Sequence, residues 1–402
     1  MIILNSNQSL KILILSPFIY PEPISTGKYN TVLATTFAEC GAEVEVIALH
    51  PLYPDWKSKK TSATLSGINI IRGGGDFLYP RSIVLRRIQL ELIYTLFIMK
   101  NLIAKSKSWD IVLPVFPPSL LFFVINFLLP KSIKKVGIVH DLQGVMARVS
   151  KNPLQSIMIK FIRILEKWSL KSCDKLIFVS QSMRNRALGD YRIDSQKTIY
   201  CYPFVSLDKS INSNVLDDKF IKGKKHIVYS GALGEKQDPL ILVEVFNQLL
   251  KKRQDVCCHI FSRGPWFNRL KSDFTKNKKK VFFHDLVDEE NLYELYVRSN
   301  VQIVPQKSGT GDGAIPSKLP NIISAGVPIF SISDPESELS KIVQESMIGN
   351  NCNSWDIDEI VQQLSDFIDR SCKVTHKDRE QLVNNYVIKN FNINNLIEGI
   401  VK

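Results

Sequence analysis

The sequence has 402 residues, of which 45% are hydrophobic and 23% are charged. This composition predicts a globular protein of two domains and excludes a disordered chain or a small disulfide-stapled one. The formal net charge is +13, and it lies in one half: residues 1–200 contain 26 Lys and Arg but 13 Asp and Glu, whereas residues 201–402 contain 26 of each. Such a basic half favours a polyanion or an anionic membrane surface as partner, although solubility alone would also account for it.

The seven cysteines are an odd number and include no CxxC pair and no Cys/His spacing typical of a zinc site. Cys40, Cys257 and Cys258 stand in apolar surroundings. We therefore expect reduced thiols in a cytoplasmic protein, with no disulfide framework and no metal ligands. The first apolar run has neither a basic flank nor a small-residue cleavage site, so it predicts a strand and not a signal peptide.

The first half of the chain alternates between short apolar runs and longer segments of helical period. The strands expected are residues 10–16, 43–49, 68–71, 110–116, 136–140, 176–180 and 198–203, and the helices expected are residues 26–40, 79–107, 119–129, 154–172 and 183–188. Alternating strands and helices predict a parallel sheet. Two of the helices, residues 79–107 and 154–172, carry Lys and Arg among Leu, Ile and Phe.

Residues 111–129 contain no charged side chain, and their length approaches the roughly 20 residues that span a bilayer. Pro114, Pro117 and Pro118 interrupt this run, and the part that follows them is too short to cross. We expect a buried strand followed by an apolar helix that either joins the core or dips into a membrane.

A polar stretch without period, residues 205–225, predicts the linker between the domains. A second series follows, with strands expected at residues 226–230, 256–261, 281–284, 301–304 and 327–332, helices at 240–252, 266–276, 289–298 and 336–344, and helical residues from 355 onward. The prediction is an α/β protein of two Rossmann-like doubly wound domains facing across a cleft. Their bounds are residues 1–204 and 205–385, and a last helix, residues 386–402, is expected to pack back on the first domain.

Ligands of doubly wound sheets bind outside the carboxyl ends of the strands, so the loops there are the candidate sites. Residues 306–326 follow an expected strand and are rich in glycine, with Pro316, Ser317 and Lys318 predicted as the first turn of a helix that ends at Gly326. Free backbone N–H groups, the positive end of the helix dipole and a lysine together suit a phosphate. An ordinary strand-to-helix connection would look the same.

A second turn of this kind follows the strand at residues 226–230, with Gly231, Gly234 and Lys236. Two lysine-bearing turns in one domain suit the two phosphates of a nucleoside diphosphate and would stabilise it as a leaving group without a metal ion. Arg263 lies in a third such turn, for which a plain loop is an equal alternative. His140 ends a strand, where it could orient a sugar hydroxyl or assist proton transfer. Asp312 could contact a sugar hydroxyl or simply occupy a solvated turn.

Several signatures are absent from the sequence: GxSxG, HExxH, the P-loop, GxGxxG, and those of helix-turn-helix, RRM and zinc-finger domains. Hydrolase triads, zinc proteases, P-loop NTPases and nucleic-acid binding are therefore unsupported.

The chain resembles the retaining glycosyltransferases of family 4, which have the GT-B fold, and within them the colanic-acid and O-antigen type. The stretches that carry the resemblance are SPFIYPEPISTGKYN, CGAEVEVIALHPLYPDW, YSGALGEKQDPL, FSRGP and IVPQKSGTGDGAIPSKLPNIISAGVP. They span nearly the whole chain in the order and spacing of the family.

The resemblance implies a nucleoside-diphosphate sugar bound mainly by the second domain and an acceptor bound by the first. The residues expected in the site are Gly27, Gly231, Lys236, Ser317 and Lys318 for the diphosphate, Arg263 and Asn321 for the nucleoside, and His140 and Asp312 as catalytic residues at the sugar. The arginine that many members place before the diphosphate lysine is missing, and Lys318 is expected to substitute for it. The family's paired glutamates fall at Gly313 and Asn321, so Asp312 and Asn321 are expected to take their roles.

The expected activity is a retaining hexosyl transfer from a nucleoside-diphosphate sugar to a lipid-linked saccharide in bacterial surface polysaccharide synthesis. No cofactor, metal ion or nucleic acid is expected to take part. The expected location is cytoplasmic and peripheral, with the basic first domain on anionic lipid at the inner face of the cell membrane. Two alternatives remain: an inactive membrane scaffold, which the missing glutamates motivate, and a nucleotide-sugar 2-epimerase, which would need an added carboxylate and histidine set.

Overall fold

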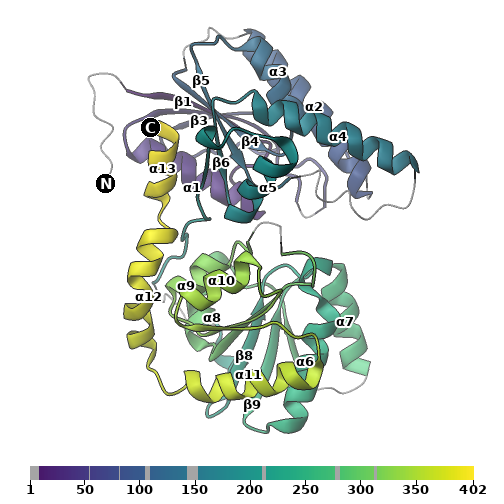
Figure 1. The fold of residues 1–402 in the computed structure, drawn as a ribbon, viewed down its shortest axis with the longest axis vertical. Helices are drawn as coiled ribbons and strands as arrows, with labels where there is room; N and C mark the ends of the chain where they lie inside the picture. Colours follow the sequence, from purple (N-terminus) through teal and green to yellow (C-terminus); the bar gives the residue numbers. More distant parts are fainter. Residues whose placement is uncertain are drawn as a thin grey trace. The chain divides into compact units, whose positions relative to one another are not determined.

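The computed structural model describes residues 9–53, 55–80, 82–104, 109–142, 153–210, 214–276, 281–311 and 315–402. The chain divides into two compact units (Figure 1). Unit 1 comprises the chain up to Pro203 together with Ile393–Lys402, and unit 2 is Phe204–Asn392. Both units are parallel sheets covered by helices, which confirms the predicted α/β class.

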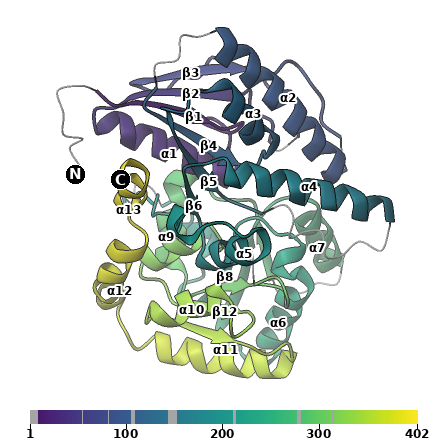
Figure 2. The same cartoon turned by 45° about the horizontal axis from the view of Figure 1, so that its top comes forward.

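Unit 1 contains a seven-stranded parallel sheet in the order β3-β2-β1-β4-β5-β6-β7. Its strands are β1 Lys11–Leu15, β2 Glu43–Leu49, β3 Ile68–Gly73, β4 Ile111–Phe116, β5 Lys134–Val139, β6 Lys175–Phe178 and β7 Thr198–Tyr200. Its helices are α1 Ser25–Glu39, α2 Ile83–Ala104, α3 Leu120–Leu128, α4 Pro153–Lys171, α5 Gln181–Tyr191 and α13 Ile393–Val401. Figures 1 and 2 show α2, α3 and α4 on one side of this sheet and α1 and α13 on the other.

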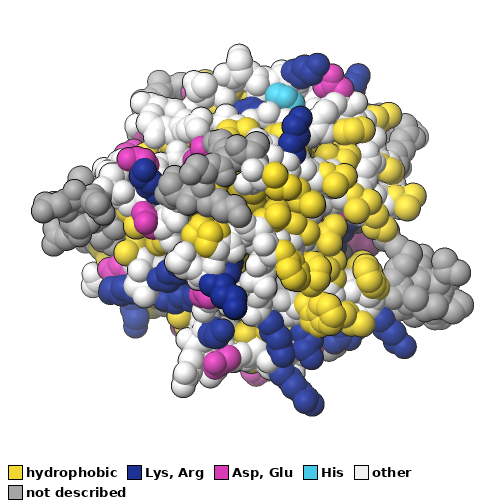
Figure 3. All heavy atoms as spheres, turned by 90° about the horizontal axis from the view of Figure 1, so that it is seen from above, with side chains coloured by type: hydrophobic (Ala, Val, Ile, Leu, Met, Phe, Trp, Pro, Cys, Tyr) yellow, Lys and Arg dark blue, Asp and Glu magenta, His cyan; other side chains and the backbone are white. Residues whose placement is uncertain are grey.

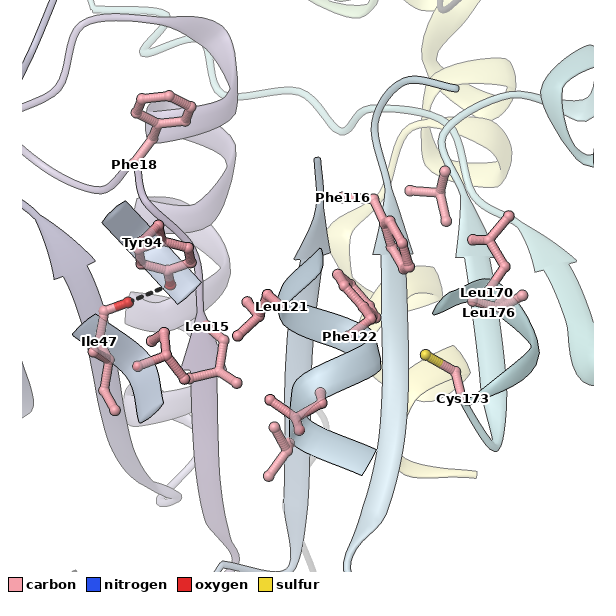
Figure 4. Close-up of a cluster of buried hydrophobic side chains, with 14 of the residues drawn as sticks. Leu15, Phe18, Ile47, Tyr94, Phe116, Leu121, Phe122, Leu170, Cys173 and Leu176 are labelled. Atoms are coloured by element: carbon pink, nitrogen blue, oxygen red, sulfur yellow. Dashed lines mark hydrogen bonds between the residues drawn. The ribbon is translucent and has the colours of Figure 1, made fainter. Parts of the chain in front are cut away.

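The core of unit 1 lies between the sheet and helices α2 to α4 (Figure 4). Leu15 and Phe116 project from the sheet; Phe122 of α3 stacks on Phe116, and Leu121 of the same helix lies on the side of Leu15. Tyr94 of α2 is fully buried, and its hydroxyl donates a hydrogen bond to the carbonyl oxygen of Ile47 at 2.7 Å. This bond satisfies the one polar group that Tyr94 brings into the core.

Unit 2 contains a six-stranded parallel sheet in the order β10-β9-β8-β11-β12-β13. Its strands are β8 Lys225–Ser230, β9 Val256–Phe261, β10 Val281–His284, β11 Val301–Pro305, β12 Ile329–Ile332 and β13 Gly349–Cys352. Its helices are α6 Pro239–Lys252, α7 Pro265–Lys276, α8 Leu292–Arg298, α9 Leu319–Ser324, α10 Glu338–Glu345, α11 Ile357–Ser371 and α12 His376–Asn390. Strand β13 is an addition to the elements that the sequence predicts.

The charge-free run at residues 111–129 is strand β4 followed by helix α3, as predicted. Glu91 of α2 accepts the first amides of α3, from Ser119 and Leu120, at 2.8 Å each. A carboxylate at a helix N-terminus satisfies N–H groups that the helix itself leaves unpaired. Among the described residues, no helix combines the length and apolarity needed to cross a membrane.

Two differences from the predicted helices affect the candidate site and the end of the chain. Helix α9 begins at Leu319 and not at Pro316, because Pro320 takes the first-turn position that favours proline. The segment expected as one helix, residues 386–402, is the end of α12 followed by α13, with a break at Phe391 and Asn392. Helix α13 is held in unit 1, where the ammonium of Lys134 donates to the last carbonyls of that helix at 3.1 Å.

Candidate functional site

Each sheet reverses its strand order at one place. In unit 2, β8 lies between β9 and β11, and in unit 1, β1 lies between β2 and β4. The loops that follow the two strands at such a point run to opposite sides of the sheet and leave room for a ligand. The loops after β8 and β11, and those after β1 and β4, are therefore the candidate half-sites, and each is described within its own unit.

Lys318 is the cation at the switch point of unit 2. Its ammonium donates a hydrogen bond to the carbonyl oxygen of Ser230, the last residue of β8, at 2.7 Å. The same nitrogen lies 4.0 Å from the ring centre of Tyr229, a cation–π distance. No carboxylate in the described part of the chain pairs with Lys318. Burial without a counter-charge lowers its pKa from 10.5 to about 7.

Gly231 shapes the space beside that ammonium. Its φ of +123° is a conformation that favours glycine, and a Cβ built there would lie 3.5 Å from Cδ of Lys318 and 3.7 Å from Nζ. These distances are ordinary van der Waals contacts, so the need for glycine at position 231 comes from its φ, and the loop after β8 passes directly beside the lysine. The structure brings together Gly231 and Lys318, two of the residues that the sequence assigns to the diphosphate.

Backbone and side-chain hydrogen bonds connect three loops at this edge of the sheet. Lys307 N donates to the carbonyl oxygen of Lys236 at 2.8 Å, which joins the loop after β11 to the loop after β8. Asp334, which follows β12, accepts Ser308 Oγ at 2.9 Å and Gly309 N at 2.8 Å. The glycine-rich loop is thus held from both sides, with its described residues in a fixed position.

Three further predicted residues lie at the same edge with exposed side chains. Lys236 lies in a 3₁₀ turn, Glu235–Gln237, just before α6. Arg263 follows β9, the neighbour of β8, and Ser317 lies in the turn before α9. Lys236 makes no ion pair with any described residue, so its ammonium is available to an anion. Ser317 is not part of a helical first turn, and α9 is too short to act as the predicted anion-binding helix.

In unit 1, His140 follows β5, and its imidazole packs edge-on against Tyr29 of α1 with ring centres 4.5 Å apart. Its Nε2 is buried and has no hydrogen-bond partner among the described residues. Burial lowers the pKa of His140 to about 4, so the ring is neutral at physiological pH. A buried nitrogen without a partner can be satisfied by a ligand.

Gly27 lies in the first turn of α1, two residues before Tyr29, and is buried. A Cβ built on it would lie 2.7 Å from the carbonyl oxygen of Glu22, in the loop after β1. The carboxylate of Glu22 accepts the amides of Leu52 and Tyr53 at 2.7 and 3.1 Å. The glycine therefore lets the loop after β1 close down on the start of α1.

Two family profiles match consecutive parts of the chain. The profile described as Glycosyltransferase Family 4 matches residues 26–209, and the profile described as Glycosyl transferases group 1 matches residues 214–386. The chain is a glycosyltransferase of the GT-B type. The two matches meet a few residues after the boundary between the units, so the second profile covers the sheet of unit 2 and the first covers the sheet of unit 1 from β2 onward.

Named relatives and solved structures of other proteins are similar to this chain. WcaI of Escherichia coli K12, named for colanic acid biosynthesis, is 23% identical over 83% of this chain and 86% of its own length. Sucrose-phosphate synthase from Thermosynechococcus elongatus has a TM-score of 0.72 at 14% identity, over 97% of both chains. WaaG, a glycosyltransferase of lipopolysaccharide biosynthesis, has a TM-score of 0.67 at 13% identity, over 94% of this chain and 95% of its own. The two structural matches show the GT-B fold.

The position of the family's second glutamate is occupied by Asn321, and this glycosyltransferase uses it within unit 2. Asn321 Oδ1 accepts the amide of Ser206 at 2.9 Å, and its Nδ2 donates to Ser206 Oγ at 3.4 Å. Nearby, Lys209 donates to Ser324 O at 2.7 Å and to Glu380 at 2.9 Å. The side chain assigned to the nucleoside thus fastens the first residues of unit 2 to α9.

Asp312 and Gly313, the positions that correspond to the first glutamate, lie outside the described residues. Sequence reasoning missed Tyr229 and Asp334. Asp334 follows a strand of the sheet, so the carboxyl-end rule applied to β12 would have found it. Nothing in the sequence alone marks Tyr229 as the ring under Lys318.

Proposed function

We propose that this glycosyltransferase moves a sugar from a nucleoside-diphosphate sugar to a lipid-linked saccharide during synthesis of a bacterial surface polysaccharide. The observation that carries the donor assignment is the ammonium of Lys318, partly buried without a counter-charge beside Gly231. A diphosphate would supply the missing anion. The names of the relatives WcaI and WaaG support a polysaccharide or lipopolysaccharide product.

The proposed mechanism uses cations for the leaving group. As the bond between the sugar and the diphosphate breaks, negative charge grows on the diphosphate oxygen, and Lys318 and Lys236 stabilise it. Binding of the diphosphate favours the protonated form of Lys318, because the new anion offsets the effect of burial. Lys318 and Gly231 act on the same phosphate, since the backbone of Gly231 passes beside the ammonium in a conformation that favours glycine.

We infer retention of configuration from the same arrangement. No nucleophile and base pair stands out in the described loops of either half-site, so the leaving diphosphate itself takes the proton of the acceptor hydroxyl. The new glycosidic bond then forms on the face that the diphosphate leaves. His140, neutral and with Nε2 unsatisfied, orients a hydroxyl of the donor sugar and carries no proton away.

The membrane part of the proposal rests on helices α2, α3 and α4, which we call the apolar face of unit 1. Helix α3 contacts both α2 and α4. The large hydrophobic side chains of this face that are half or more exposed are Leu85, Leu92, Leu96, Ile103, Phe127, Phe161, Ile164 and Trp168. On α2 they recur at intervals of 7, 4 and 7 residues, which places them on one side of the helix.

Aromatic and basic side chains complete the apolar face. Phe123 stacks on Trp168 at 6.0 Å and touches Phe127 at 5.1 Å, which joins α3 to α4. Lys160 and Lys171 are exposed on α4. Figure 3 shows hydrophobic side chains gathered on one side of the molecule with Lys and Arg along their border. Exposed apolar side chains with flanking cations suit the surface of an anionic bilayer, where a lipid-linked acceptor would be found.

A second candidate is an inactive membrane scaffold on the same fold. Asn321 favours it, because a residue that the family uses for the donor is hydrogen-bonded to Ser206 here. The scaffold would keep the apolar face of unit 1 and lack transfer activity.

The decisive experiment measures release of nucleoside diphosphate from a panel of donor sugars, with lipid-linked saccharides as acceptors. Wild type is compared with Lys318→Met and with Lys251→Ala, an exposed lysine of α6. We expect release from one donor, its loss in Lys318→Met, and wild-type rates in Lys251→Ala. Absence of release with every donor and acceptor would support the scaffold and overturn the transferase proposal.

A further inference from the structure

Strands β8, β9 and β10 place three histidines on one face of the unit 2 sheet. In the parallel register, His226 of β8 is opposite Cys257 of β9, and His259 of β9 is opposite Phe282 of β10. Phe282 is two residues before His284 on β10. Paired residues of neighbouring strands, and residues two apart on one strand, share a face. His226, Cys257 and His259 are all buried. The sequence separates Cys257 from His226 by 31 positions, so no spacing motif reveals this group.

The ligand atoms of His226, Cys257 and His259 converge. One nitrogen of each ring and the Cys257 sulfur lie within 4.8 Å of one another. The closest pair is His226 Nδ1 and His259 Nε2, at 2.9 Å. Two nitrogens bound to one tetrahedral ion at about 2.0–2.1 Å each stand roughly 3.3 Å apart, so the rings need to separate by only a few tenths of an ångström.

The other nitrogen of each ring already has a partner. His226 Nε2 lies 3.1 Å from the carbonyl oxygen of Ile221, and His259 Nδ1 lies 3.1 Å from His284 Nε2. Metal-bound histidines almost always donate their second N–H to an acceptor, which fixes the tautomer and the ring plane. In the metal-free chain the carbonyl oxygen of Ile221 can only accept, so His226 Nε2–H donates to it, His259 Nε2–H donates to His226 Nδ1, and His284 Nε2–H donates to His259 Nδ1. An ion between the two rings would take the place of the proton on His259 Nε2, and His259 would then carry its proton on Nδ1 and donate to His284.

Phe220 closes the group on the side away from the sheet. Its ring centre is 4.8 Å from that of His226 and 5.3 Å from that of His259. An apolar cover of this kind keeps bulk water from the ligands. We propose that His226, Cys257 and His259 form a binding site for a thiophilic divalent transition-metal ion of the Zn²⁺ class, with Ile221 and His284 orienting the two rings.

The ligand chemistry selects the metal. Two imidazoles and a thiolate suit Zn²⁺ and exclude Mg²⁺ and Ca²⁺, which prefer oxygen. Three protein ligands leave the fourth tetrahedral position to water. The thiol of Cys257 loses its proton to solvent when the ion binds, so no oxidation or reduction is involved.

The ion would have a structural role. His226 precedes Ser230, the residue bonded to Lys318, by four positions, which is about 13 Å along a strand. The site instead joins β8 and β9 to the segment that carries Phe220 and Ile221. Because the folded state binds the ion more tightly than the unfolded chain, the ion raises the stability of unit 2 without entering the transfer reaction.

The test uses the full chain without a histidine tag, freed of metal by a chelator and supplied with Co²⁺, both in the native state and during refolding. We expect one Co²⁺ per chain, the visible bands of a tetrahedral site and a near-ultraviolet thiolate-to-cobalt band. Zn²⁺ should displace the Co²⁺ and raise the melting temperature. Cys257→Ser should lose the thiolate band and weaken binding at least about tenfold, and His259→Gln, which keeps the thiolate, should weaken binding to a similar extent.

Cys372→Ser is the matched control, because Cys372 is an exposed thiol of the same unit. It should keep the spectrum and the affinity of the wild type. A wild-type spectrum without the thiolate band would overturn the proposal whatever the variants do, since that measurement does not depend on their folding. Equal Co²⁺ binding by wild type and Cys257→Ser would overturn it as well, and the histidines would then form only a hydrogen-bonded chain between strands.

Discussion

The ammonium of Lys318 and the carbonyl oxygen of Ser230 are 2.7 Å apart at the point where the unit 2 sheet reverses its strand order. The bond joins the segment before α9 to the end of β8, over 88 positions of sequence. A carbonyl carries only a partial charge, so this bond satisfies one N–H of the ammonium and leaves its charge unpaired. The free protein therefore holds a cation in a position that an anionic ligand would stabilise.

Replacing this lysine tests its role directly. Lys318→Met keeps a chain of similar length and removes the charge, and we expect kcat/KM to fall about 10²- to 10³-fold, the usual effect of losing one group that stabilises the transition state. Steady-state kinetics with the donor that supports release by the wild type would measure it. Thermal unfolding of the variant serves as the folding control. A loss of less than threefold in a folded variant would show that Lys318 does not contact the diphosphate.

The pH dependence of donor binding follows from the same group. Its pKa is about 7 in the free protein and rises when a diphosphate binds. Donor affinity should therefore be constant below pH 7 and fall by about tenfold per pH unit above it, until the pKa of the complex is reached. Calorimetric titration between pH 6 and 9 would show this decline. Lys318→Arg, which stays charged throughout that range, should bind with a flat profile.

The folding stability of the free protein should change with pH in the opposite direction to donor affinity. The folded state loses the proton of Lys318 near pH 7, whereas the unfolded chain keeps it up to about 10.5. Because the unfolded state binds more protons between these values, this group adds stability as the pH rises from 7 to 10. Lys318→Met should remove that contribution, which denaturation at several pH values would detect.

His140 should matter for turnover but not for the neutral pH profile. With its pKa lowered to about 4, the imidazole does not titrate between pH 5 and 8. His140→Ala should lower kcat roughly 10- to 100-fold through lost orientation of the sugar, a lower range than removal of a proton-transfer group. The pH profile of wild-type kcat should show no ionisation with a pKa near 6.5. Such an ionisation in the wild type, absent in His140→Ala, would assign proton transfer to the histidine instead.

The fold was largely predictable because most buried strands are continuous apolar runs between loop residues. Strand β13 was missed because GNNC has no apolar or β-branched run, and it is a strand only through pairing with β12, with Ile329 opposite Gly349. The start of α9 was misplaced because Pro316 and Pro320 both suit a helix start by sequence. Tertiary pairing and a choice between two prolines are not visible in local patterns.

The sequence predicted which loops form the candidate site, but not which of their residues are in contact. The carboxyl-end rule selected Gly231 and Lys318, which the structure brings side by side: a Cβ built on Gly231 would lie 3.5 Å from Cδ of Lys318. The bond between Asn321 and Ser206 spans 115 positions, so the sequence could assign Asn321 only by its match to a family position. The nearness of Cys257 to His226 likewise depends on the register of β8 and β9.

Two glycines in helices offer a matched pair of substitutions. A Cβ at Gly27 would lie 2.7 Å from a backbone oxygen of Glu22, so Gly27→Ala must shift the loop after β1 and should cost about 1–3 kcal/mol. Gly189 in α5 has nothing within 4 Å of an added Cβ, so Gly189→Ala should stabilise the protein by about 0.4–1 kcal/mol. Urea denaturation would measure both changes. If Gly27→Ala also stabilised the protein, helix propensity and not the contact with Glu22 would determine the effect at position 27.

The last prediction concerns the apolar face of unit 1. Leu96→Ser, Phe161→Ser and Ile164→Ser together remove three exposed apolar side chains, each able to contribute about 1 kcal/mol or more on entering a bilayer interface. We expect this triple variant to bind vesicles with anionic lipid at least about tenfold more weakly than wild type in a sedimentation assay. Wild-type binding should also fall with added salt and with uncharged lipid, because Lys160 and Lys171 contribute.

The matched control for this face lies in unit 2. Leu382 and Ile388 of α12 are also exposed, at 44% and 54%, so Leu382→Ser with Ile388→Ser removes exposed apolar side chains outside this face. This double variant should sediment with vesicles as the wild type does. Equal losses in the two variants would mean that binding follows general hydrophobicity and not the apolar face. If the wild type did not bind vesicles, the proposed membrane association would be wrong, and the proposed donor chemistry would not be affected.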